Sequence, residues 1–282
     1  MIVTSYGLYP DLSEADSYRM AAFCIDTAIR NAVAAGADPK RIALLDNFCW
    51  CSPDDENRLY QLKNAAQACH DYAVSYQTPF ISGKDSMYND FQGYDKNGRP
   101  VKISIQPTLL ITSIGIIENV YSAVTPDFKQ AGDLLYLLGD TFNELLPYVD
   151  AAKNLRIYQT LHTAILNNLI SSAVSVNKGG LAVALVKGSM AGKLGIKVQL
   201  SGIKGKVSKA MTAFFSESMG RIIVSITPEN KKKFEDLFKG VAFSEIGVVS
   251  QNDGINLNFG PSSVNTTVKQ TLSVYRNKFA GY

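Results

Sequence analysis

The segment from Thr78 to Asp90 carries the densest group of side chains suited to phosphate and metal chemistry. An apolar stretch runs into the polar run Ser82-Gly83-Lys84-Asp85-Ser86. Gly83 lets backbone amides approach an anion, Lys84 offers a point charge for phosphate, and Asp85 offers a hard oxygen ligand for Mg²⁺. The spacing is not that of a Walker A loop. A polar turn with a surface ion pair would explain the same residues, so both interpretations stay open.

Two other places suggest anion binding. Asp46 and Asn47 end the apolar stretch 41–47, and polar residues just past a buried strand tend to face a ligand crevice. An Asp that caps the next turn is the alternative. Gly179 and Gly180 open a predicted helix, where free amides bind phosphate well, although glycines at helix starts also serve packing.

A fourth candidate is a polar face on the predicted helix 14–36. Asp26 and Arg30 are four residues apart, as are Thr27 and Asn31. Each pair therefore shares a face of the helix. An intrahelical ion pair beside a polar contact is the alternative to a binding face.

Length and composition favour a globular protein of two modest domains. The chain has 282 residues, a formal charge of +3 and 46% hydrophobic residues, which gives no argument for nucleic acid or a membrane surface as a partner. No apolar run reaches about 18 residues and no secretory signal is visible, so we expect a cytoplasmic protein. The cysteines are expected to be reduced and mostly buried; they are Cys24, Cys49, Cys51 and Cys69.

The hydrophobic pattern mixes helices and strands without strict alternation, which indicates an α+β fold with two layers. Helices are expected at 14–36, 56–75, 150–172, from 179 onward, at 229–240 and at 266–279. Strands are expected at 41–47, 78–83, 102–105, 108–118, 133–139, 196–200, 220–226, 243–249 and 255–259. Residues 120–132 are the best candidate for a linker between two domains.

Several short motifs occur in a fixed order along the chain. They are R-N-x-V-A-x-G-A-x-P at 30–39, A-L-L-D-N-F at 43–48, T-P-x-x-S-G-K-D-S-M at 78–87, P-T-L-L-I at 107–111, G-D-x-x-Y-x-L-G at 132–139, G-G-L-A-V-A-L at 179–185 and S-E-S-x-G-R at 216–221. Together they resemble the carboxyl-terminal half of phosphoribosylformylglycinamidine synthase (FGAM synthase). No single motif is specific for this family, but the combination is.

This resemblance implies a two-domain unit. The A domain, expected at 1–124, would be a β-sheet with helices on one face that pairs with a second A domain into a barrel-like dimer. The B domain, expected at 125–282, would be an α+β sandwich. The pairing partner would be a second copy of the chain or the first half of the same enzyme, with nucleotide near the seam.

The resemblance also implies which residues bind ligands. The candidates for binding ATP are Asp46, Gly83, Lys84, Gly179 and Gly180. Ser86 and Asp85 would contact the substrate, formylglycinamide ribonucleotide. The position of Lys84 holds Lys in the long form of the enzyme and a metal-binding Asn in the short form, so Lys84 is expected to pair with phosphate.

Two departures from the family pattern concern its magnesium site. The family has Glu four residues before the helix Asn, where this chain has Thr27, with Asp26 one step away and Asn31 retained. The family also reads D-x-S-D-G-G before L-A-V-A-L, where Ser175 and Lys178 replace the two carboxylates. Asp26 and Asn31 remain as metal-ligand candidates, and we expect this Mg²⁺ site to be weakened or absent.

The implied activity is that of an ATP-dependent carbon–nitrogen ligase of purine biosynthesis. ATP would activate the amide oxygen of the ribonucleotide, and ammonia from glutamine would then attack. The family's catalytic His motif and its glutaminase module have no match in this sequence. We therefore assign no catalytic residue, expect a glutaminase domain or subunit as a partner, and expect the chain to be inactive alone.

Two alternatives accompany this interpretation. The first is a degenerate structural or regulatory half-domain that dimerises and binds nucleotide weakly or not at all. The losses at Thr27, Ser175 and Lys178 favour it. The second is another ATP-using relative of the aminoimidazole ribonucleotide synthase or selenophosphate synthase type, which the string S-G-K-D-S-M disfavours.

Overall fold

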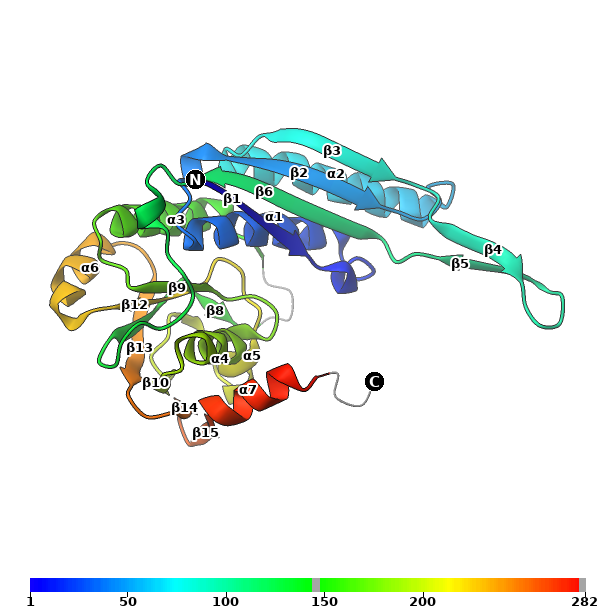
Figure 1. Ribbon diagram of the computed structural model, residues 1–282. Helices are drawn as coiled ribbons and strands as arrows, with labels where there is room; N and C mark the ends of the chain where they lie inside the picture. The colour runs from blue at the N-terminus through cyan, green and yellow to red at the C-terminus, as the bar shows by residue number, and fades with distance from the viewer. Residues whose placement is uncertain (144–147, 279–282) are drawn as a thin grey trace.

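The computed structural model describes residues 1–143 and 148–278, and it consists of two main β-sheets and the helices that pack on them (Figure 1). The mixed α+β fold expected from the sequence is confirmed. Within the described residues, no helix is long and apolar enough to span a bilayer.

The first sheet has the strand order β1-β6-β2-β3. Its strands are β1 (Ile2–Leu8), β2 (Ile42–Cys49), β3 (Phe80–Ser86) and β6 (Thr108–Ile116). β6 pairs antiparallel with both β1 and β2, whereas β2 and β3 are parallel. A parallel pair needs a crossover connection, which helix α2 (Glu56–Tyr76) provides.

Helices α1 (Ser17–Ala34) and α2 cover one face of this sheet, and no described element covers the other face (Figure 1). Asp16 and Asp55 cap the two helix starts by accepting hydrogen bonds from backbone N–H groups of the first turn. Burial alternates along β6, and Leu109 lies completely buried under the helices. We call the uncovered side of this sheet the open face.

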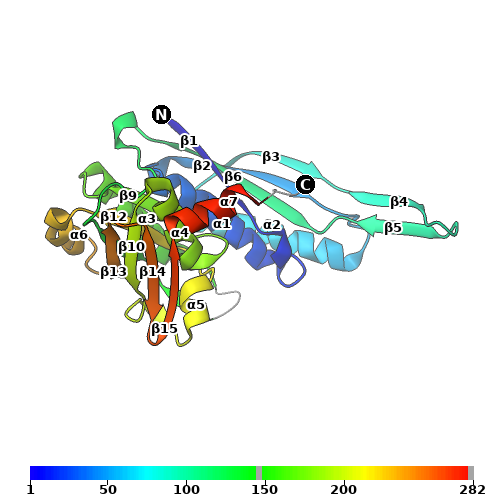
Figure 2. The ribbon, with the colours of Figure 1, turned by 60° about the horizontal axis from the view of Figure 1, so that its bottom comes forward.

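Strands β4 (Asp90–Tyr94) and β5 (Pro100–Ser104) form a separate antiparallel ribbon in the chain between β3 and β6. This ribbon, which we call the arm, projects from the end of the first sheet away from the rest of the molecule (Figures 1 and 2).

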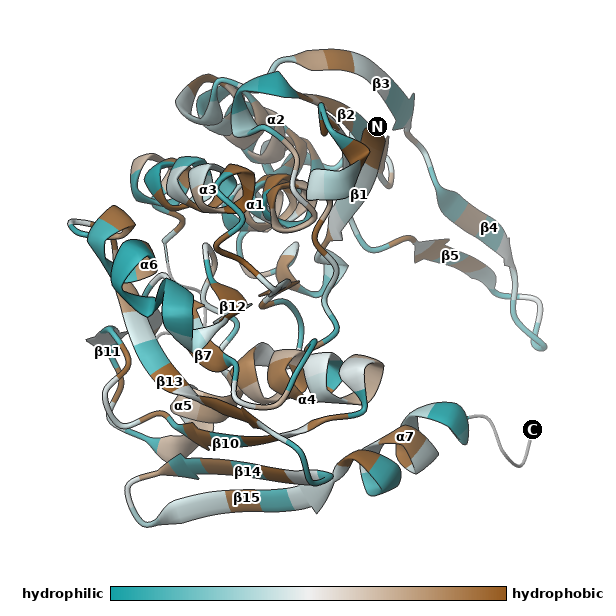
Figure 3. Ribbon diagram, turned by 60° about the vertical axis from the view of Figure 1, so that its left-hand side comes forward, coloured by the Kyte–Doolittle hydropathy of each residue, from teal (hydrophilic) through white to brown (hydrophobic). Residues whose placement is uncertain are grey.

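The second sheet has the strand order β15-β14-β10-β13-β7-β12-β9. Its strands are β7 (Leu134–Leu138), β9 (Ser172–Ser175), β10 (Gly195–Gln199), β12 (Ile222–Ile226), β13 (Phe243–Ser250), β14 (Gly254–Phe259) and β15 (Ser262–Thr267). A small parallel pair joins β8 (Thr141–Phe142) and β11 (Gly205–Lys206). Apolar residues run along β10 and β14, whereas helix α6 is largely hydrophilic (Figure 3).

The remaining helices belong to this second part of the chain. They are α3 (Ala151–Leu166), α4 (Gly180–Gly192), α5 (Ala210–Phe215), α6 (Lys231–Leu237) and α7 (Val268–Arg276). Short 3₁₀ helices occur at η1 (Pro10–Leu12), η2 (Pro39–Arg41), η3 (Val120–Ser122) and η4 (Pro228–Asn230).

One hydrophobic core joins the two parts of the chain. It contains Phe23 of α1, Tyr76 of α2, Tyr158 of α3 and Ile222 of β12, and α3 packs on both α1 and α2. A second core lies around α4 and includes Leu185. The helices of the first sheet are therefore held firmly against the second sheet.

Several elements differ from the sequence-based expectation. The expected elements did not include the strands β1, β4, β8, β9, β11 and β15 or the short helix α5. The polar run Ser82–Ser86 forms most of strand β3, so its interpretation as a polar turn is wrong. The domain boundary at residue 124 and the barrel-like pairing remain predictions.

Candidate functional site at the edge of the first sheet

Asp46 and Gly83 lie side by side in the first sheet. They are register partners in the parallel pair of β2 and β3. A Cβ added to Gly83 would lie 2.6 Å from Oδ1 of Asp46, so glycine leaves room for this carboxylate over the neighbouring strand. Two segments that the sequence singled out separately are thus adjacent in space.

The pleat of the strands places the Asp46 carboxylate on the helix-covered face of the sheet. Asp46 is two residues from Leu44 and two from Phe48, so its side chain points to the same face as theirs, and both are buried under the helices. Asp85 is the register partner of Phe48 and therefore lies on this face too. Burial raises the pKa of Asp46, and the charge of Asp85 raises it further. A cation or a hydrogen-bond donor of a ligand would favour the charged form of Asp46 at this edge.

Lys84 and Ser86 alternate with Gly83 and Asp85 along β3, so their side chains lie on the open face. Lys84 is the register partner of Asn47, and Ser86 is the register partner of Cys49. Lys84 is exposed and takes part in none of the ion pairs found in residues 1–143 and 148–278. An unpaired ammonium beside an amide and a hydroxyl suits a phosphate group.

Asp26 lies in a buried hydrogen-bond network and not at a metal site. It is completely buried. Its oxygens accept from the hydroxyls of Tyr76 and Tyr158, the side-chain amide of Asn154, the backbone N–H of Gly220 and the guanidinium of Arg30. A carboxylate with this many donors has no free oxygen for a cation, so the metal-ligand prediction for Asp26 does not fit the structure.

Arg30 forms the intrahelical ion pair with Asp26 that the sequence offered as an alternative. It also donates to Ser175 Oγ at 2.9 Å and to Asn177 Oδ1 at 2.9 Å in the second part of the chain. Burial alone lowers the pKa of the Arg30 guanidinium, but the charge of Asp26 outweighs burial, so this pKa is raised. The Arg30 guanidinium thus places a positive charge between α1 and the second part of the chain.

Asn31 is also engaged. Its Oδ1 accepts from the side-chain amide of Asn177 at 3.1 Å, and its Nδ2 donates to the carbonyl of Tyr6 at 3.2 Å. Among the described residues, no group of three or more His, Cys, Asp or Glu side chains is placed to hold a metal ion. The predicted weakening or absence of the Mg²⁺ site stays a prediction.

A carboxylate of the chain itself, that of Glu217, lies at the start of α4. The backbone N–H of Gly179 donates to Glu217 Oε1 at 2.8 Å. Gly179 and Gly180 have φ angles of +86° and +65°, and a Cβ on Gly180 would lie 2.6 Å from the Phe215 carbonyl carbon. Both glycines are thus required by backbone geometry, and Glu217 occupies the place where the sequence predicts a phosphate.

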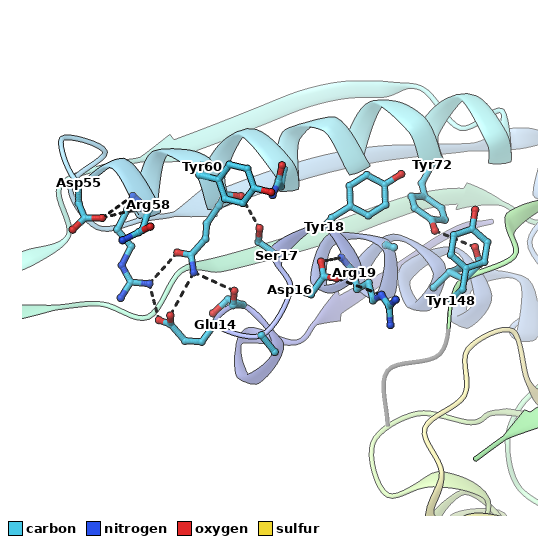
Figure 4. A pocket seen from close by; sticks show the side chains of 17 residues that line it. Glu14, Asp16, Ser17, Tyr18, Arg19, Asp55, Arg58, Tyr60, Tyr72 and Tyr148 are labelled. Carbon is cyan, nitrogen blue, oxygen red and sulfur yellow. Dashed lines mark hydrogen bonds and ion pairs between the residues drawn. The ribbon is translucent and has the colours of Figure 1, made fainter. Parts of the chain in front are cut away.

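Two hollows lie away from this sheet edge. The larger, of about 810 Å³, lies between the first halves of α1 and α2 (Figure 4) and contains none of the predicted site residues. Its arginines are paired, Arg58 with Glu14 at 2.7 Å and Arg19 with Asp16 at 3.3 Å, so they are not free to bind phosphate. Its residues come from separate segments, which is why no sequence motif marks it.

The second hollow, of about 550 Å³, lies where the two departures from the family pattern meet. Asn31, Ser175 and Asn177 line it together with apolar side chains of α4 and α7. No carboxylate is present among its described lining residues. A divalent cation would lack a charged ligand there.

Comparison with known proteins identifies the family of the two parts of the chain. Residues 2–117 match the AIR synthase related protein, N-terminal domain, and residues 139–259 match the AIR synthase related protein, C-terminal domain. The chain is 31% identical over 277 residues to phosphoribosylformylglycinamidine synthase subunit PurL of Leuconostoc mesenteroides, covering 92% of this chain and 35% of the relative. The chain thus spans about a third of the length of the curated relatives it matches.

Solved structures share the fold. PurL of Thermotoga maritima complexed with ATP has a TM-score of 0.77 at 15% identity, covering 95% of this chain and 43% of that chain. The same PurL complexed with FGAR has a TM-score of 0.76 at 14% identity, covering 95% and 46%. The resemblance to FGAM synthase stated from the motifs is confirmed. This chain belongs to the AIR synthase related family and carries the N-terminal and C-terminal domains of that family in sequence order.

Proposed function

We propose that this chain supplies one synthetase-type unit of an FGAM synthase, an ATP-dependent ligase that amidates formylglycinamide ribonucleotide (FGAR) in cytoplasmic purine biosynthesis. The observation that carries the proposal is the arrangement at the edge of the first sheet. There Asp46 lies against Gly83 on one face, and the unpaired Lys84 lies beside Asn47 on the other. Two of the motifs quoted above, at 43–48 and 78–87, meet at this edge.

We assign the nucleotide and the substrate to opposite faces of the first sheet. Asp46, Gly83 and Asp85 share the helix-covered face and form the nucleotide side. Asp85 and Asp46 are the hard oxygens that remain at this edge for the Mg²⁺ that accompanies ATP, and that ion would neutralise phosphate charge. Lys84 and Ser86 form the substrate side on the open face, so Asp85 and Lys84 exchange the roles that the motifs alone implied. Because β3 is an edge strand, the nucleotide and the substrate would lie on opposite faces of this one strand.

The chemistry of these residues is positioning and electrostatic stabilisation. Lys84 would hold the phosphate of the ribonucleotide by charge, and the Asn47 amide and Ser86 hydroxyl would orient it. Asp46 would orient a hydrogen-bond donor of the nucleotide. We assign no ligand to Gly179 and Gly180, because Glu217 already accepts the amide hydrogen at the start of α4.

The open face is expected to be covered by a partner. Exposed apolar side chains on it include Ile2, at 67%, and Tyr6, at 63%, which water would otherwise contact. We propose that a second sheet of the same kind packs there, from another copy of this chain or from the first half of the enzyme. A glutaminase domain or subunit would supply ammonia. The degenerate half-domain is the weaker alternative, since the curated relatives are FGAM synthase subunits.

Calorimetric titration of the purified chain with FGAR tests the proposal. Lys84→Gln should weaken binding by about tenfold or more, since a charge-assisted contact to phosphate is lost. Lys63→Gln is the matched control, because it removes an exposed lysine of α2 far from the open face and should leave binding unchanged. The chain alone should not amidate FGAR with ammonia and ATP. Equal loss in both variants, or no FGAR binding by the unaltered chain, would contradict the proposed site.

A further inference from the structure

The arm is a two-stranded ribbon that no other described strand extends. β4 and β5 pair only with each other. An isolated two-stranded hairpin is marginally stable at best in water, and packing against another surface is what usually stabilises it. The arm projects beyond every other element of the sheet it leaves (Figures 1 and 2). A surface that covers the arm would therefore stabilise it.

The pleat places Phe91 and Ile103 on one face of the arm and Gln92, Lys102 and the exposed Tyr94 on the other. Phe91 and Ile103 are opposite each other in register and are 60% and 61% exposed. The Phe91 ring lies over Gly93, where a Cβ would be 2.7 Å from the ring, so the ring is spread along this face. Gln92 and Lys102 are the next register pair and lie on the opposite face.

The base of the arm is fixed to the first sheet. The N–H of Ile105 donates to the carbonyl of Asn89 at 3.0 Å, and the N–H of Asn89 donates to the carbonyl of Trp50 at 3.0 Å. Trp50 is completely buried. The carboxylate of Asp90, the first residue of β4, accepts the backbone N–H of Ser52 at 2.9 Å. The direction of the arm is therefore set before any partner binds, which lowers the entropy cost of docking.

The same chain has a complementary surface on its open face. A shallow hollow of about 380 Å³ lies between β1 and β6, and it is lined by Thr4, Ser5, Tyr6, Leu8, Leu110 and Thr112. Tyr6 is 63% exposed and Leu8 is 37% exposed. The hollow thus offers apolar walls with a few hydroxyls, which suits apolar side chains and not a phosphate.

We propose that the arm docks on the first sheet of a second copy of this chain, with Phe91 and Ile103 seated in the hollow between β1 and β6. A projection and a hollow on one chain are filled together in a two-fold pair, because each copy contributes one of each. The inference rests on the proposed covering of the open face and adds the arm as the element that reaches across to the partner.

The exposed apolar area agrees with a dimer of ordinary size. Six exposed apolar side chains of β1, the arm and its base are counted here: Ile2, Tyr6, Leu8, Phe91, Ile103 and Ile105. Taking about 200 Å² for a whole side chain, these leave on the order of 600 Å² of surface exposed per copy. A standard interface buries about 800 Å² per partner, so the arm and the hollow supply much of what a stable pair needs.

Sedimentation velocity over a concentration series tests this docking. The unaltered chain should dimerise. The double variant Phe91→Ser with Ile103→Ser should weaken dimerisation by about tenfold or more, because apolar anchors are lost. Gln92→Ser with Lys102→Ser is the matched control, since it alters the neighbouring pair on the opposite face, and it should change dimerisation little. At concentrations where the chains are monomeric, both double variants should keep the melting temperature of the unaltered chain, because the arm lies outside both cores.

A crosslinking experiment locates the contact. Chains carrying Ile103→Cys and chains carrying Tyr6→Cys are mixed under oxidising conditions, both with Cys49→Ser because Cys49 is the native thiol that is not buried. A disulfide-linked species should form in the mixture and not in either preparation alone. Three outcomes would overturn the docking: a monomeric unaltered chain, equal dimerisation of both double variants, or no crosslink in a dimeric mixture. FGAR binding is measured separately, so these outcomes leave the proposed function to its own test.

Discussion

Replacing Arg30 by Met removes one partner of an ion pair in which both side chains are completely buried. The Asp26 carboxylate would stay behind without its cation, and breaking a buried pair in this way costs about 3–5 kcal/mol of unfolding free energy. Two tyrosine hydroxyls still donate to Asp26 at 2.6 Å each, and hydrogen bonds to a charge compensate part of that loss. We therefore expect a cost near the lower end, about 3 kcal/mol.

A double-mutant cycle separates the ion pair from the packing of the arginine stem. Asp26→Asn with Arg30→Met removes both charges of the pair, so the double variant should be more stable than the sum of the two single losses predicts, by about 2 kcal/mol. Urea unfolding followed by circular dichroism measures all four proteins, with the slope checked for two-state behaviour. Arg41→Met is the control, because Arg41 and Glu118 form an exposed pair worth about 0–1 kcal/mol.

The reasoning would be refuted if Arg30→Met cost less than about 1 kcal/mol, or if the two single losses simply added. Arg30 also donates to Ser175 and Asn177 across the seam between the two parts of the chain. A separate early transition in the Arg30→Met curve would show that these contacts couple the unfolding of the two parts.

Three further outcomes follow from the site. Gly83→Ala should destabilise the chain by about 1–3 kcal/mol in thermal unfolding, because its Cβ would meet the Asp46 carboxylate at 2.6 Å, whereas Gly202→Ala has nothing within 4 Å and should not. Burial raises the pKa of Asp46 above its ordinary 3.8. The stability that Asp46 contributes is therefore complete at lower pH and is lost as pH rises through its pKa in the folded chain. Asp46→Asn should abolish this pH-dependent loss of stability, which unfolding measured across pH would show. Glu217→Ala should cost about 1 kcal/mol in urea unfolding, since the Gly179 N–H at the start of α4 loses its acceptor; no change would show that water replaces it.

The sequence predicts the neighbourhood of Asp46 and Gly83 well, for a physical reason. Both residues belong to short apolar stretches separated by one amphipathic helix, and that pattern favours a parallel pair of strands. The structure has this pair, β2 and β3, with the two residues in register. Periodicity of apolar residues was sufficient for α1 and α2 as well, with ends that shift by a few residues.

The distribution of Lys84, Asp85 and Ser86 over two faces could not be predicted in the same way. A run of polar residues in an edge strand has the composition of a turn, since neither side is deeply buried. Which side chain faces the helices depends on the strand register, and one residue of difference reverses every assignment.

The hydrogen-bond donors around Asp26 also could not be predicted from the sequence. Its donors Tyr76, Asn154, Tyr158 and Gly220 are 50 to 194 residues away in the sequence, and nothing in local spacing relates them to it. The sequence also does not predict that Glu217 lies at the start of α4, because Glu217 is 38 residues from Gly179.

A crystal structure of this chain with FGAR bound is the most direct measurement. The phosphate of the ribonucleotide should lie within about 3 Å of Lys84 Nζ on the open face, with Asn47 and Ser86 as neighbours. A ribonucleotide bound instead in the hollow lined by Ser175 and Asn177, with Lys84 free, would contradict the proposed site.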